Sequence, residues 1–149
     1  MDYRSIYPSP FGDIELTSDG MSLTGVRFMS GRGMSSNRDN PIIAEAIRWL
    51  DLYFAGNRPD FMPALHAQGS PFQRRVWREL LNIPYGATAT YGDIARRVGC
   101  RSAQAVGQAV GRNPIAIIVP CHRVVGSNGS LTGYAYGLDF KKRLLELES

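Results

Sequence analysis

Residues 90–111 read TYGDIARRVGCRSAQAVGQAVG, and this stretch decides the fold. Thr90 can cap a helix that runs to Val98, and Ser102 can cap a second helix that ends near Gly111. The short turn between them gives the spacing of a helix-turn-helix. Many antiparallel helix pairs bind nothing, so the pattern predicts two adjacent helices and makes nucleic-acid binding one hypothesis.

Helical signals continue on both sides of this pair. Upstream, Ser70 is a candidate N-cap and Pro71 a first helical residue. Apolar residues then recur at near-helical spacing at Phe72, Val76, Trp77, Leu80 and Ile83. Downstream, residues 115–119 are a β-branched run expected to be buried, residues 126–137 a glycine-rich loop, and residues 139–148 a closing helix. This part of the chain is predicted to be mainly helical.

The first part of the chain has a different pattern. Residues 3–29 alternate loosely between apolar and polar side chains, with two turn signals, which predicts a small antiparallel sheet. Residues 31–37 are expected to form a loop, and Asn40 and Pro41 open a helix. The predicted apolar face of that helix holds Ile43, Ile47, Leu50 and Phe54.

We therefore predict an α+β fold with a sheet-plus-helix domain at residues 1–69 and a mainly helical domain at residues 70–149. The first has 6 basic and 8 acidic residues and the second 11 and 5, giving net charges of −2 and +6. Fifteen of the 17 basic residues are Arg, whose planar guanidinium suits phosphates and base edges. A polyanionic partner for the second domain is one hypothesis, and a merely soluble basic surface is the other.

Composition narrows the class of protein. The chain has 149 residues, 44% of them hydrophobic, which is typical of a packed globular protein and excludes disordered and collagen-like classes. The longest apolar run, residues 115–120, is far shorter than the ~20 residues of a membrane-spanning helix. Residues 1–10 show no signal-peptide pattern. We expect a cytoplasmic protein with no membrane partner, in which the two cysteines stay reduced.

The sharpest chemical feature is VPCHRVV at residues 119–125, where a cysteine directly follows the buried run. The thiolate is the reactive form of cysteine, and a nearby His or Arg favours it. A turn or a bridging water could bring His122 to Cys121. The carboxylates available to orient the imidazole are Asp139, Glu146 and Glu148. The alternative is that Cys121 is simply a small buried hydrophobic residue.

No metal site is predicted. The remaining candidate ligands, Cys100 and His66, have no recognised ligand spacing to Cys121 and His122. Residues 1–69 contain no Cys and a single His. We expect neither a metal nor a cofactor.

Residues 120–124, PCHRV, resemble the signature of the O6-alkylguanine-DNA alkyltransferases, also called methylated-DNA–protein-cysteine methyltransferases. Further pieces follow the order of that family: Phe72-Gln73, Val76-Trp77, Ile83-Pro84, Thr90-Tyr91, Ala105-Val106-Gly107, Asn113-Pro114 and Gly133-Tyr134. The resemblance covers residues 70–148. It implies DNA repair by a monomeric, single-turnover enzyme without cofactor or obligate protein partner. The alkyl group would pass irreversibly from O6 of guanine in double-stranded DNA to Cys121.

The same resemblance implies roles for the residues around this cysteine. His122 would be the water-relayed base that makes Cys121 a thiolate, and Glu148 the carboxylate that orients His122. Asn113 would tie the second DNA-binding helix to the active-site segment. Tyr91 would hydrogen-bond the guanine ring and help it leave as a neutral base.

Substrate contacts are implied as well. Because a stacked guanine cannot be attacked in line, its nucleotide must flip out of the duplex. Tyr134 and Ala135 would close over the extruded base, with the Ala135 N–H directed at O6. Val124 would offer its carbonyl to the exocyclic amine.

On the DNA side, the resemblance implies that the second helix of the pair enters the minor groove. Ala105 and Gly107 would belong to that surface. Candidate phosphate contacts are Arg96, Arg97 and Arg101, for each of which a solvated helix face is the alternative. The chain departs from the family at Gln104, which stands where an arginine finger usually fills the gap left by the flipped base. We expect less efficient flipping as a result.

Two rival functions remain open at this point. A reader would bind alkylated bases and recruit other repair factors without transfer, but such readers replace the cysteine that this chain retains. A cysteine hydrolase using Cys121 and His122 would show turnover and need no DNA.

Overall fold

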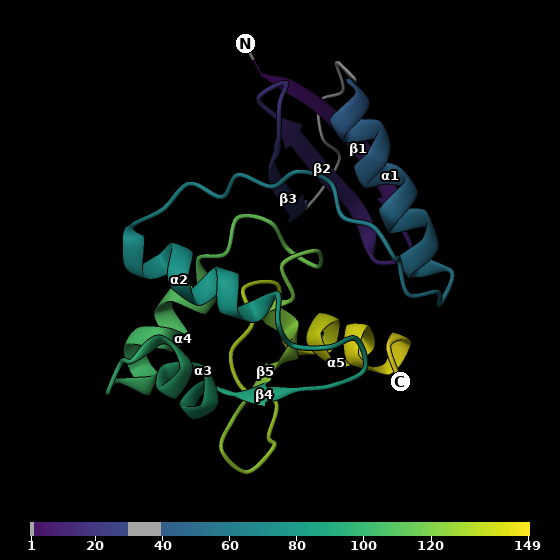
Figure 1. The fold of residues 1–149 in the computed structure, drawn as a ribbon. Coiled ribbons are helices and arrows are strands. Elements are labelled where there is room, and N and C mark those ends of the chain that lie inside the picture. Colours follow the sequence, from purple (N-terminus) through teal and green to yellow (C-terminus); the bar gives the residue numbers. More distant parts are fainter. Residues whose placement is uncertain (1, 30–39) are drawn as a thin grey trace. The chain divides into compact units, whose positions relative to one another are not determined.

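A computed structural model describes residues 2–29 and 40–149 of the chain (Figure 1). The loop predicted at residues 31–37 lies outside the described residues. The chain forms two compact units, Met1–Gln68 with Pro114–Ala116, and Gly69–Asn113 with Ile117–Ser149. A single boundary near residue 69 therefore misses the short Pro114–Ala116 segment. In the described part of the chain, no helix is both long enough and apolar enough to cross a membrane.

The first unit contains the predicted antiparallel sheet, in the order β1 (Tyr3–Ser9), β2 (Gly12–Ser18) and β3 (Leu23–Phe28). Alternate residues of β2 are buried, as expected for a sheet with one covered face. In Figure 1, helix α1 (Pro41–Phe54) lies along that sheet. The returning segment pairs with β3, because Ala116 N donates to the Val26 carbonyl at 2.9 Å.

The buried face of α1 differs from the predicted one. Ile43 and Leu50 are buried as expected, but Ile47 and Phe54 are only half-buried. The other buried positions are Ala46, Trp49 and Tyr53. The buried face includes Trp49 and Tyr53, whose rings stack 5.2 Å apart. Because these large rings bury more apolar area than the residues of the predicted face, the helix turns their side toward the core.

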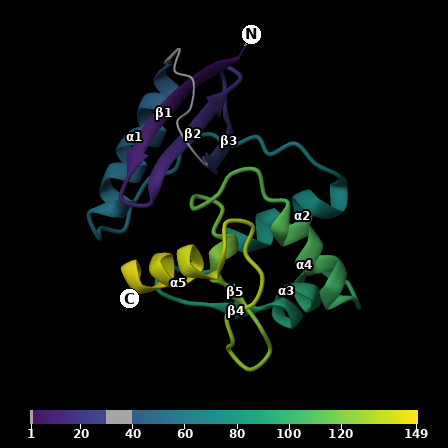
Figure 2. The same cartoon turned by 180° about the vertical axis from the view of Figure 1, so that it is seen from behind.

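The second unit is mainly helical. Its elements are α2 (Pro71–Leu80), β4 (Ala89–Thr90), α3 (Tyr91–Val98), α4 (Ala103–Gly111), a 3-10 turn η1 (Cys121–Arg123), β5 (Val124–Val125) and α5 (Leu138–Leu147). Figure 2 shows α2, α3 and α4 packed together, and the long loop between β5 and α5. The predicted α+β class is confirmed.

The predicted helix caps of this unit are present. Ser70 and Thr90 each accept a hydrogen bond from the backbone three residues on, and both form capping boxes. Gly99 ends α3 with a positive φ of 71°, which glycine adopts without strain. The indole N–H of Trp77 donates to the Ala109 carbonyl at 2.8 Å and joins α2 to α4. Helix α2 also packs against η1, so the helices lie next to the segment that carries Cys121.

That segment is buried over residues 115–120 but forms no regular strand. Ile117 has a φ of +70°, an unusual conformation for a β-branched residue and the single non-glycine case in the described chain. The backbone then enters η1 at Cys121. Beyond η1, β5 pairs in parallel with β4, matching Ala89 with Val124.

Candidate active site

The second unit contains a cavity of about 120 Å³, and Cys121 is one of the residues that line it. Its lining consists of Tyr91, Gly107, Val110, Gly111, Asn113, Cys121, Gly133, Tyr134, Ala135 and Tyr136. Typical pockets for drug-sized ligands measure ~300–1,000 Å³. A cavity of this size with aromatic walls suits a single flat ring system.

Cys121 opens η1 and is 6% exposed, with a free thiol. Burial raises the pKa of this thiol, because the charged thiolate is poorly solvated there. Hydrogen bonding from Asn113, the charge of Lys141 and a hydrogen bond from Tyr134 oppose that rise in pKa. The sulfur therefore rests as a thiol and needs a base to become a nucleophile.

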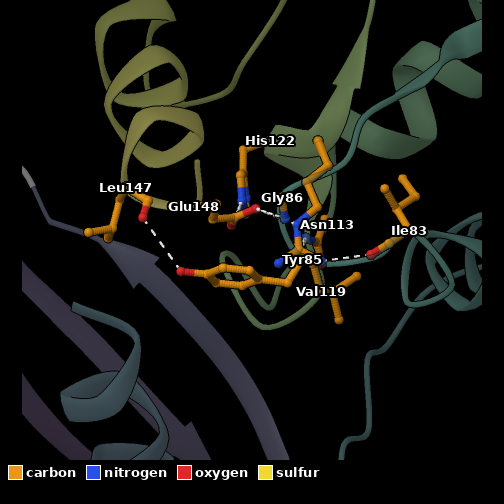
Figure 3. Close-up of polar contacts among 9 residues, drawn as sticks. Ile83, Tyr85, Gly86, Asn113, Val119, His122, Leu147 and Glu148 are labelled. Atoms are coloured by element: carbon orange, nitrogen blue, oxygen red, sulfur yellow. Dashed lines mark hydrogen bonds and ion pairs between the residues drawn. The ribbon is translucent and has the colours of Figure 1, made fainter. Parts of the chain in front are cut away.

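A buried triad lies beside this cysteine. His122 Nε2 lies 2.5 Å from Glu148 Oε2, and Arg123 Nε donates to Glu148 Oε1 at 2.7 Å. Figure 3 shows the Glu148 carboxylate turned toward His122. Burial lowers the pKa of His122, and the hydrogen bond and charge of Glu148 oppose this. The imidazole is therefore neutral at rest and able to accept a proton that Glu148 would then stabilise.

The C-terminal end of the chain is held in place so that Glu148 can act there. Arg123 also donates through a terminal nitrogen to the Ile83 carbonyl at 2.7 Å. The Tyr85 hydroxyl points at the Leu147 carbonyl, 3.5 Å away (Figure 3). Of the three carboxylates considered from the sequence, Glu148 is the one that the structure brings to His122. Glu148 directly follows α5 as its C-cap residue, so the end of this helix sets the position of the carboxylate.

Asn113 and Tyr91 also border the cavity. The Asn113 amide donates to the Val119 carbonyl at 2.8 Å, which joins the end of α4 to the segment before Cys121. The Tyr91 hydroxyl donates to the Thr132 carbonyl at 3.0 Å. Burial raises the pKa of Tyr91, and hydrogen bonding from the Thr132 side chain partly opposes this. Tyr91 is thus a protonated hydrogen-bond donor at neutral pH.

Two of the three predicted substrate-contacting residues line the cavity, and the third does not. Tyr134 and Ala135 both line the cavity. The ring of Tyr134 packs edge-on against Tyr136 at 5.7 Å, and burial raises its pKa well above the usual value. Val124 is fully buried in β5 and is not among the lining residues. A contact of its carbonyl with substrate stays a prediction.

The predicted DNA-contacting residues lie on α3, α4 and the turn between them. Arg96, Arg97, Arg101 and Gln104 are exposed, and Ala105 is half-exposed. Arg96 pairs with Asp93 one turn earlier, so part of its charge is already compensated. Gly107 lines the cavity, where a Cβ would meet the Tyr91 ring at 3.8 Å. The surface of α4 is therefore continuous with the cavity wall.

Sequence reasoning missed Lys141 and the role of Arg123. Lys141 is fully buried, and its ammonium donates to the carbonyls of Thr132 and Gly133 at 2.9 and 3.1 Å. A signal was present, since Lys141, Leu144 and Glu148 fall on one face of the closing helix. Among the described residues, no group of three or more His, Cys, Asp or Glu could hold a metal ion.

Two family models match most of the chain. The DNA binding domain of 6-O-methylguanine DNA methyltransferase matches residues 71–149. The ribonuclease-like domain of 6-O-methylguanine DNA methyltransferase matches residues 3–66.

Individual relatives match over nearly the whole length. A methylated-DNA–protein-cysteine methyltransferase of Methanosarcina acetivorans is 49% identical, with 98% of this chain and 97% of that protein covered. The crystal structure of the Mycobacterium tuberculosis O6-methylguanine methyltransferase superposes with a TM-score of 0.88 at 44% identity, covering 99% of this chain and 93% of that one. A Mycobacterium tuberculosis structure in complex with DNA gives a TM-score of 0.86 at 46% identity, covering 96% and 90%.

Proposed function

The chain belongs to the 6-O-methylguanine DNA methyltransferase family, and from this premise we propose that Cys121 is the residue that accepts the alkyl group. The protein is a methylated-DNA–protein-cysteine methyltransferase that repairs O6-alkylguanine in DNA. The observation that carries the assignment is the position of Cys121 in the cavity lining, next to the buried pair of His122 and Glu148. The other cysteine, Cys100, is not part of that lining.

In the proposed reaction the Cys121 sulfur attacks the alkyl carbon on O6. The S–C bond forms as the C–O6 bond breaks, and its electron pair stays on the guanine. The thiol proton passes through a water to His122, whose Nδ1 is the ring nitrogen directed away from Glu148 Oε2. Glu148 stabilises the resulting imidazolium.

The guanine, which stays in its DNA strand, is released from the alkyl carbon and takes up one proton, so that it ends as a neutral base. Tyr91 donates toward the ring, a role that its raised pKa and its place in the cavity wall support. The thioether on Cys121 is a poor leaving group, so each molecule reacts once. His122 then releases the thiol proton to solvent and solvent replaces the proton taken up by the guanine, so the net change is exchange of the thiol proton for the alkyl group.

The partner is DNA, as it is for the relative solved in complex with DNA. We further propose that the substrate is double-stranded DNA from which the alkylated nucleotide is flipped into the cavity. The narrow cavity, with Tyr134 and Ala135 in its wall, supports this, because a stacked base could not enter it. Gln104, exposed on the first turn of α4, would face the gap left in the duplex.

A cytoplasmic location and a monomeric state without an obligate protein partner remain our proposals. Both cysteines are free thiols, the form that a reducing compartment preserves. A reactive thiol used once per molecule needs that protection until it meets its substrate.

The decisive experiment measures intact mass after incubation with a duplex that contains O6-methylguanine, followed by peptide mapping. We expect one methyl group per protein, located on Cys121. Cys121→Ser should take up none while still binding the duplex, and the matched control Cys100→Ser should react like the wild type. Methylation of Cys100 alone, or continued turnover, would contradict the assignment. Binding without any adduct would favour the reader.

A further inference from the structure

Lys141 is a buried cation that the proposed reaction does not use. Its side chain is fully buried, and lysine is almost never so unless paired. None of the ion pairs among the described residues includes it. Instead, the ammonium donates to the carbonyls of Thr132 and Gly133 at 2.9 and 3.1 Å. The Tyr91 ring centroid lies 5.8 Å from the same nitrogen.

The two carbonyls belong to the loop that builds one wall of the cavity. Gly133 itself lines the cavity, as do the three residues after it. Tyr91 also reaches this turn, since its hydroxyl donates to the Thr132 carbonyl at 3.0 Å. One side chain from α3 and one from α5 therefore hold the same turn. Without the ammonium, the two carbonyls would lose a charged hydrogen-bond donor.

Helix α5 connects this turn to the proton-accepting residues. Lys141, Leu144 and Glu148 are buried on one face of the helix, and Glu148 contacts His122 at the other end. Glu148 lies seven positions after Lys141, which corresponds to a helical rise of about 10 Å. A single rigid element thus supports both the cavity wall and the base beside Cys121.

We propose that Lys141 is a positioning residue for alkyl transfer: its ammonium holds the Thr132–Gly133 turn in the conformation that completes the cavity and keeps a positive charge near the Cys121 sulfur. This inference rests on the proposed function. The contacts with the turn and the electrostatic interaction between Lys141 and Cys121 support it.

The positioning role of Lys141 can be tested by varying the pH, because it requires the protonated ammonium. Burial lowers the pKa of Lys141 to about 8, and the charge of Cys121 opposes this. The titratable groups that interact with Lys141 are Tyr91 on α3, whose ring lies 5.8 Å from the ammonium, and Cys121 and His122 on η1, which both feel its charge. The pKa values of Tyr91 and Cys121 are raised and that of His122 is lowered, so Lys141 is the one of these groups whose charge changes first above neutral pH.

The experiment follows transfer from the free O6-alkylguanine base, which removes flipping and DNA affinity from the measured rate. The wild-type rate should fall as pH rises through about 8 to 9, because the ammonium loses its charge. Lys141→Met should react at least about tenfold more slowly at pH 7 and lack this descending limb. The matched control Lys142→Met, an exposed neighbour on the same helix, should behave like the wild type.

Hydrogen exchange of residues 126–137 gives a second readout that needs no alkyl transfer. Lys141→Met should exchange faster than the wild type in this loop, and Lys142→Met should not. If Lys141→Met does not fold, Lys141→Arg replaces it, and its permanent charge should move the descending limb to higher pH. Equal rates and equal exchange, or a slower variant that keeps the limb near pH 8, would overturn the inference. Failure of the wild type to take up any alkyl group would instead overturn the proposed function.

Discussion

Glu148 is the penultimate residue of the chain, yet it is 4% exposed and contacts both His122 and Arg123. A carboxylate at this depth is tolerated because its partners are in hydrogen-bond contact with it. Removing one member of a buried charged set leaves the others without compensation, which costs more than the set itself contributes.

We therefore expect Glu148→Gln to lower the free energy of unfolding by about 3–5 kcal/mol and to slow alkyl transfer. Glu146→Gln, two residues earlier and exposed, should change stability by no more than ~0.5 kcal/mol. Chemical denaturation and the mass assay measure the two effects. If both variants have wild-type stability, the buried triad does not form in solution.

His122 gives a pH prediction with a defined sign. Its pKa is lowered in the folded protein, so the unfolded chain binds more protons below its usual value of 6.5. Stability should fall as the pH decreases from 6.5 toward 5, by at most about 1.4 kcal/mol per pH unit. Denaturation at several pH values measures this slope. His122→Gln should lack it, and a slope unchanged in that variant would assign it to another group.

At the scale of elements, the helices of the second unit were predictable because their signals are local. Ser70, Thr90 and Ser102 cap helices that begin where the sequence predicts them. The parallel pairing of β4 with β5 involves two residues from each strand, too few for any pattern to appear. Local patterns alone could not show the cavity either, because its lining comes from α3, α4, η1 and a loop. The family resemblance did predict six of the lining residues: Tyr91, Gly107, Asn113, Cys121, Tyr134 and Ala135. The helix face that Lys141 shares with Leu144 and Glu148 is a weak signal, because a lysine in a helix is usually exposed, and the tertiary contacts of Lys141 show its burial.

The exposed basic residues of α3 and the following turn make a prediction about DNA affinity. Replacing both Arg97 and Arg101 with Ala should weaken duplex binding and reduce the slope of log K against log salt by up to about 2. Arg96 is left out of this pair because it already contacts Asp93. Arg58→Ala, in the acidic first unit, is the control. Fluorescence anisotropy at several salt concentrations would measure both quantities, and an unchanged slope would place the DNA surface elsewhere.

Gln104 on α4 leads to a separate prediction about flipping. Arginine would add a planar cation that can stack and hydrogen-bond in the gap left by the flipped base. If it supplies even ~1.4 kcal/mol, Gln104→Arg should react with duplex about tenfold faster and with the free base at an unchanged rate. Comparing the two substrates in both proteins measures this. A parallel change on the free base would locate the effect in the cavity instead.

On the scale of the whole molecule, the first unit is completed by a segment far along the chain. Ala116 donates to the Val26 carbonyl, and Val26 N donates to the Pro114 carbonyl at 3.0 Å. Nothing in the sequence marks this return, because the apolar run at residues 115–119 is equally typical of a strand buried within one domain. Ala116→Pro would remove the N–H donor, and we expect it to destabilise the first unit by about 1–3 kcal/mol.

Tryptophan fluorescence can report on the unfolding of each unit separately. The chain has two tryptophans. Trp49 belongs to the first unit and stacks on Tyr53, and Trp77 belongs to the second unit and donates a hydrogen bond to the Ala109 carbonyl. Each unit thus contains its own buried fluorophore, whose emission should shift to the red when that unit unfolds. In the Trp77→Phe background the remaining emission reports on the first unit, and in the Trp49→Phe background on the second. Ala116→Pro should therefore move the transition reported by Trp49 more than the one reported by Trp77, so that the two single-tryptophan proteins separate the stabilities of the two units.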